Sequence, residues 1–185
     1  MLHLKLEPKL SSEEEVRARL LELREREDIE GGVLTWPNGR RLKVKTHTYL
    51  TRHKVLSDLA NEREVYRCFL EGAVDDAASA LGGARGRALS DFVMDLHSRL
   101  EDVAEEVRTF TDSISSLDRQ DAVKEIKSRY SGSLQAAAFA AWNGENPEQR
   151  LRDLLCRRLE HAGKRNSLKR ELGLPDWTID LQALR

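Results

Sequence analysis

One stretch near the N-terminus limits the possible folds most strongly, because it has the pattern of two strands joined by a tight turn. Residues 29–36 are rich in β-forming side chains, and residues 37–39, Pro-Asn-Gly, are a strong turn signal. Residues 41–46 then alternate strictly between polar and apolar side chains. Because side chains alternate across a strand, Lys43 and Lys45 should share one face. The sequence therefore predicts a β-hairpin.

The rest of the chain shows helical periodicity. A seam of apolar residues with a spacing of three and four predicts the longest helix over residues 90–115. Further helices are expected over residues 12–26, 48–70, 118–130, 134–142 and 147–163. We therefore expect an α+β protein, with a small hairpin or sheet remnant in residues 1–49 followed by an all-helical domain in residues 50–185.

The two ends of the chain carry weaker signals. Residues 2–6 alternate between apolar and polar, which is typical of a strand, and Pro8 would end that strand. In the C-terminal tail, Trp177, Ile179 and Leu181 are spaced so that a segment folding back onto the helices would bury them.

Residues 82–87, Gly-Gly-Ala-Arg-Gly-Arg, read as a flexible loop with two interpretations. The glycines and arginines could contact RNA phosphates, or the segment could be a plain connector between helices. The segment lacks the spacing of a phosphate-binding P-loop.

Composition limits the class of protein. The formal net charge is −1, so any nucleic-acid surface must be local. Cys68 and Cys156 are far apart in apparently amphipathic segments, which predicts reduced core thiols of a cytoplasmic protein. No apolar run reaches the length of a membrane span, so we expect no membrane association.

Residues 150–170 carry the only strong local charge bias, with an excess of Lys and Arg over acids. This bias predicts an RNA-facing surface, and the alternative is a solvated helix whose bases complement the helix dipole. The candidate RNA-binding residues are Arg157, Arg158, Lys164 and Arg165.

The hairpin carries a motif as well as a fold signal. The run Glu-Gly-Gly-Val begins at Glu30, and Lys-Val-Lys begins thirteen residues later at Lys43. This pair of motifs resembles the last two nucleotidyltransferase motifs of ATP-dependent RNA ligases of bacteriophage type. The resemblance implies catalytic roles for Glu30, Lys43 and Lys45, with Glu30 near the nucleotide and its Mg²⁺ and the two lysines on the phosphates. It also implies that Gly31 and Tyr49 help to bind ATP.

The resemblance covers the C-terminal half of such a ligase. No lysine in the chain is followed three residues later by glycine, which is the motif of the adenylated lysine. We therefore expect no activity from the chain alone. It would be a fragment of a ligase, one piece of a split enzyme that works with a separate N-terminal half, or a descendant with another role.

The expected partner in the first two cases is RNA with 5′-phosphate and 3′-hydroxyl ends, such as tRNA under repair. A phage-encoded protein of this kind would act in the host cytoplasm. The alternative function is a non-catalytic helical module with a degenerate hairpin, which binds RNA or another protein.

Overall fold

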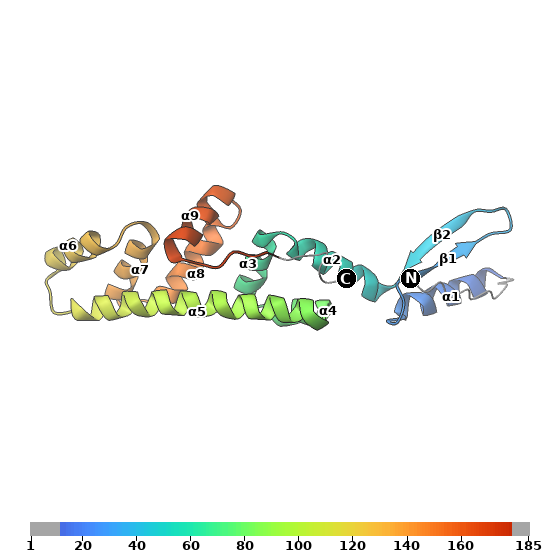
Figure 1. The fold of residues 1–185 in the computed structure, drawn as a ribbon, viewed down its shortest axis with the longest axis horizontal. Coiled ribbons are helices and arrows are strands. Elements are labelled where there is room, and N and C mark those ends of the chain that lie inside the picture. Colours follow the sequence, from blue (N-terminus) through green and yellow to red (C-terminus); the bar gives the residue numbers. More distant parts are fainter. Residues whose placement is uncertain (1–11, 179–185) are drawn as a thin grey trace. The chain divides into compact units, whose positions relative to one another are not determined.

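A computed structural model describes residues 12–178 of the chain (Figure 1). The chain divides into two compact units, the first ending at Leu56 and the second beginning at Ser57. A two-stranded antiparallel hairpin belongs to the first unit, and the second is built from helices. The predicted α+β fold is confirmed.

The first unit consists of α1 (Glu13–Glu25), β1 (Gly31–Thr35), β2 (Arg41–Lys45) and the start of α2 (His47–Leu59). A capping box begins α1. Ser12 Oγ accepts a hydrogen bond from the Glu15 backbone N–H at 3.1 Å, and the Glu15 carboxylate accepts one from the Ser12 N–H at 3.3 Å. These bonds satisfy two of the free N–H groups at the helix start.

The hairpin has the register that its turn demands. The Gly39 N–H donates to the Trp36 carbonyl at 2.9 Å, and the strands pair from Gly31 opposite Lys45 to Thr35 opposite Arg41. One face of the hairpin packs on α1, where Val44 is buried. Because side chains alternate, the odd-numbered residues lie on the other face, which is largely exposed.

The second unit is organised around one long helix, α5, which runs along the whole unit (Figure 1). Its buried stripe includes Leu89, Leu96, Leu100 and Val107, as the apolar seam predicts. The helices of this unit after α2 are α3 (Glu62–Glu71), α4 (Val74–Leu81), α5 (Gly83–Ser113), α6 (Arg119–Arg129), α7 (Gly132–Trp142), α8 (Pro147–Arg158) and α9 (Ala162–Leu172).

Helix α7 is packed by several other helices of this unit. It packs against both α5 and α8, with further contacts to α6 and α9. None of its residues from 133 to 142 is exposed, in keeping with the Ala-rich, apolar sequence. Small side chains let neighbouring helices approach α7 on all sides.

The prediction of a loop over residues 82–87 is wrong. Only Gly82 lies outside the helices, and Gly83 begins the first turn of α5. The reason is close packing of α4 on α5, because a Cβ atom at Gly86 would lie 2.3 Å from the Ala78 carbonyl oxygen. A glycine that reads locally as a helix breaker serves here as a helix-packing residue. The segment therefore supplies no phosphate-binding loop.

The prediction for the cysteines holds only in part. Both are free thiols; Cys68 is half-buried, and burial raises the pKa of its thiol. Cys156 is exposed on α8, so the prediction of a core thiol is wrong there. It lies on the polar side of an amphipathic helix whose buried side carries Leu151 and Leu155.

At the C-terminal end, Trp177 folds back onto the helices as expected. Its Nε1–H donates to the Leu59 carbonyl at 2.7 Å, and its ring packs edge-on against Phe92 with 5.0 Å between centroids. The predicted strand over residues 2–6 and the predicted burial of Ile179 and Leu181 fall outside the described residues. Within residues 12–178, no helix combines the length and the apolar character that crossing a membrane requires.

A cluster of charges joins the start of α3 to the C-terminal segment. The Glu62 carboxylate accepts hydrogen bonds from Lys169 Nζ and, at 3.1 Å, from the Trp177 backbone N–H. The Lys169 side chain is only 7% exposed and also donates to Asp176 at 2.6 Å. Removing Glu62 would therefore leave a buried ammonium group with a single, largely exposed partner.

We predict that Glu62→Ala lowers the free energy of unfolding by about 3 kcal/mol, the cost of breaking a buried ion pair. Urea denaturation followed by circular dichroism measures the change. The control is Glu125→Ala, which removes an exposed acid on α6 and should cost less than about 0.5 kcal/mol. Equal losses in the two variants would contradict the role of Glu62.

Two glycines in helices should respond in opposite directions to alanine. Gly86→Ala should lower the free energy of unfolding by about 2 kcal/mol, because the new methyl group collides with the backbone of α4. Gly163→Ala should raise it by about 0.5 kcal/mol, because nothing lies within 4 Å of the added Cβ. The same denaturation experiment measures both. A stable Gly86→Ala variant would show that α4 does not pack so closely.

Candidate phosphate-binding site

The structure brings Glu30, Lys45 and Tyr49 together at the base of the hairpin. Lys45 Nζ donates to the Glu30 carboxylate in an ion pair, and the same ammonium lies 4.3 Å from the centroid of the Tyr49 ring. The side chains of Lys45 and Glu30 are 35% and 40% exposed, so solvent and ligands can reach them. The three residues come from the end of β2, the residue before β1 and the first turn of α2.

Thr46 holds this arrangement together. It is fully buried, and its N–H donates to the Glu30 carbonyl at 3.1 Å. Its Oγ1 donates to the Ile29 carbonyl and accepts from the Tyr49 N–H, each at 3.2 Å. The Thr46 side chain thus ties the segment just before β1 to the start of α2, and its backbone N–H holds Glu30 beside Lys45.

Sequence reasoning gave Thr46 no role of its own. The available signal was its position just before a helix, where a threonine hydroxyl commonly accepts from a backbone N–H of the first turn.

The charges at the site act on one another. The hydrogen bond from Lys45, followed by the attraction of its charge, lowers the pKa of the Glu30 carboxyl below its usual range. The hydrogen bond to Glu30 raises the pKa of the Lys45 ammonium above its usual range. The charge of Lys43 adds to the lowering of the Glu30 pKa, so Lys43 lies within electrostatic reach of that carboxylate.

Lys43 itself is exposed and lies two residues before Lys45 on the same face of β2. It makes no ion pair with the side chains of residues 12–178. Its ammonium group is therefore available to an anion from outside the described structure, whereas Lys45 would have to exchange its partner.

Gly31 is needed for a reason other than ligand approach. It pairs with Lys45, and a Cβ atom at this position would lie 2.1 Å from the Val44 carbonyl oxygen. The backbone of β2 itself thus makes the close approach. A side chain at residue 31 would push the strands apart beside the Glu30–Lys45 pair.

The described residues do not by themselves supply a complete set of Mg²⁺ ligands. Residues 12–178 contain no group of three His, Cys, Asp or Glu side chains placed to hold a metal ion, and the Glu30 carboxylate is already paired with Lys45. Mg²⁺ is commonly held by one or two carboxylates together with phosphate oxygens and water. Glu30 fits one such position, and other ligands would have to complete the site.

The predicted RNA-binding residues of α8 and α9 do not form one free surface. Arg157 and Lys164 are exposed. Arg158 donates to Ser133 Oγ at 2.8 Å and lies 4.0 Å from the Glu171 carboxylate. Arg165 is also held by an internal hydrogen bond.

The guanidinium of Arg165 is turned into the protein. It donates to the Leu159 carbonyl at 2.7 Å, and its side chain is only 11% exposed. Nearby, Lys169 is committed to Glu62 and Asp176. Much of the positive charge of residues 150–170 is therefore used inside the helical unit.

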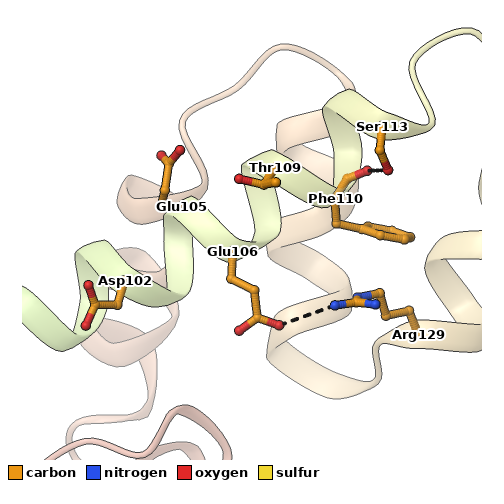
Figure 2. Close-up of a pocket in the computed structure, with 7 residues that line it drawn as sticks. All are labelled: Asp102, Glu105, Glu106, Thr109, Phe110, Ser113 and Arg129. Carbon is orange, nitrogen blue, oxygen red and sulfur yellow. Dashed lines mark hydrogen bonds and ion pairs between the residues drawn. The ribbon is translucent and has the colours of Figure 1, made fainter.

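A shallow groove of about 490 Å³ lies between α5 and α6 and was not predicted from the sequence (Figure 2). Glu106 points toward Arg129 across it, with 3.7 Å between their charged atoms, and the Arg129 guanidinium lies 5.0 Å from the centre of the Phe110 ring. The lining residues are Asp102, Glu105, Glu106, Thr109, Phe110, Ser113 and Arg129. Three carboxylates against one arginine make the groove unsuited to phosphate.

Comparisons with protein-family models, with curated proteins and with solved structures find no match for this chain.

The Glu30–Lys45 pair gives a prediction for pH dependence. Because the Glu30 pKa is lowered in the folded chain, its stabilising contribution is present above the usual glutamate pKa and is lost as the pH falls through the lowered value. Lys45→Ala should move the Glu30 titration midpoint back toward the usual range. NMR titration of the Glu30 side-chain carboxyl carbon measures the shift.

The matched control is Lys54→Ala, which removes an exposed lysine of α2 and should leave the Glu30 midpoint in place. A Glu30 midpoint that does not respond to Lys45→Ala would show that the pair does not persist in solution.

Proposed function

We propose that this chain supplies the phosphate-contacting hairpin and a helical RNA-docking unit to an ATP-dependent RNA ligase. The observation that supports this most is the assembly of Glu30, Lys45 and Tyr49 at one end of the hairpin, with Lys43 beside them on the same strand face. These residues carry the motif resemblance, and they come together although Glu30 and Lys45 are fifteen residues apart in sequence.

The geometry suits the stabilisation of phosphate charge. Ammonium groups at alternate strand positions point the same way and can neutralise charge on neighbouring phosphoryl oxygens. When a phosphate binds, Lys45 exchanges the Glu30 carboxylate for the phosphate oxygen. The Tyr49 ring beneath Lys45 limits where the ammonium can move.

This exchange gives Glu30 its second role. The freed carboxylate lies beside the bound phosphate, where it can serve as one oxygen ligand of Mg²⁺. The metal, when bound, would draw charge from the reacting phosphoryl group. The chain's own contribution is to keep a carboxylate and two cations within reach of the same phosphate.

Strand joining by such ligases takes three steps, namely enzyme adenylation, transfer of AMP to an RNA 5′-phosphate, and attack by a 3′-hydroxyl. The first step needs a lysine nucleophile from a second polypeptide or segment, because the K-x-x-G motif is absent from this sequence. The helical unit would dock the RNA, with tRNA as a candidate, through its exposed cations Arg157 and Lys164.

In the test, the chain is mixed with an N-terminal ligase polypeptide that bears the K-x-x-G lysine. Labelled ATP is then added to the mixture. We predict that the mixture labels the lysine-bearing polypeptide and that Lys43→Ala lowers the labelling rate about a hundredfold, the loss typical of removing one preorganised charge. Lys43 is the better choice for substitution, because Lys45→Ala would also leave Glu30 without its partner.

Lys54→Ala makes the same change of charge in the same unit and should keep the rate within twofold of the unsubstituted chain. Unchanged labelling with Lys43→Ala would show that the hairpin does not act on the nucleotide phosphates.

A further inference from the structure

We infer that the exposed face of the hairpin binds the backbone of a single-stranded nucleic acid along a row of three cations, Arg41, Lys43 and Lys45. We call this set the cation row. All three are at odd-numbered positions of β2, so they lie on the face opposite α1. The motif resemblance assigns no ligand or partner to Arg41, which lies two residues before the first lysine of the Lys-Val-Lys motif.

The row is not neutralised by its own strand partners. The residues opposite it on β1 are Thr35, Val33 and Gly31, none of which carries a charge. Arg41 and Lys43 are both exposed and make no ion pair with any side chain of residues 12–178. By contrast, Arg158, Arg165 and Lys169 in the helical unit are held by internal acceptors.

The spacing of the row fits a nucleic-acid backbone. Cations at alternate positions of a strand repeat every ~6.8 Å, which is close to the separation of successive phosphates in an extended single strand. The row as a whole spans about 13 Å from Lys45 to Arg41. Arg41 is the member of the row farthest along β2 from the Glu30–Lys45 pair.

This inference adds an RNA-binding face to the proposed function. It rests on that function only for the identification of the bound nucleic acid as the RNA to be joined. Binding is measured by fluorescence anisotropy with a labelled single-stranded oligoadenylate over a series of salt concentrations. We expect Arg41→Gln to weaken binding about fivefold and to reduce the salt slope by about one.

Two matched variants make the result specific. Arg52→Gln removes an exposed arginine from α2 in the same unit and should leave the affinity within twofold. Arg41→Lys keeps the charge and should retain most of the affinity, which separates loss of the cation from damage to the hairpin.

Equal losses for Arg41→Gln and Arg52→Gln would overturn the inference, as they would mean a diffuse electrostatic effect. Displacement of the oligoadenylate by polyglutamate at equal charge concentration would also overturn it, in favour of an acidic polypeptide. The proposed function is judged separately by the effect of Lys43→Ala on ATP labelling, so either idea can fail while the other stands.

Discussion

The candidate site depends on the buried threonine between the hairpin and the first turn of α2. Thr46 bonds to the backbone at Ile29, Glu30 and Tyr49, and each of these bonds fixes one part of the site. Without them, a short two-stranded hairpin would have only its own ladder and the packing of α1 to set its position, and isolated hairpins are marginally stable. The Glu30–Lys45 pair is therefore a consequence of backbone geometry more than of attraction between exposed charges, which contribute little by themselves.

The helical unit uses its charges differently. The half-buried carboxylates of Glu62 and Glu171 accept hydrogen bonds from other helices, and the basic side chains around them are engaged in these internal contacts. The Glu171 carboxylate accepts hydrogen bonds from both the N–H and the hydroxyl of Ser133 at the start of α7. The exposed basic surface of residues 150–170 is thus smaller than their number of Lys and Arg residues suggests. The hairpin, by contrast, keeps Arg41 and Lys43 exposed.

The sequence predicted what depends on local chemistry. The hairpin follows from the Pro-Asn-Gly turn and strict alternation, and the core stripe of α5 follows from its spacing. Two of the errors involve contacts between one helix and the next along the chain. Gly86 reads as a loop residue until Ala78 of α4 is placed against it, and Arg165 reads as a surface cation until the Leu159 carbonyl accepts from it. The role of Thr46 was missed because it joins two segments that the sequence separates.

The central claim is that the ammonium groups of Lys43 and Lys45 bind phosphate together. It is tested most directly by NMR of the lysine ¹⁵Nζ groups during titration with ATP and Mg²⁺. We expect the signals of Lys43 and Lys45 to shift along a single binding curve while the Lys54 signal stays in place. The Lys45 signal should also show the loss of its contact with Glu30. Small, equal shifts of all three lysines would contradict it, because they would mean that the nucleotide senses only the general charge of the chain.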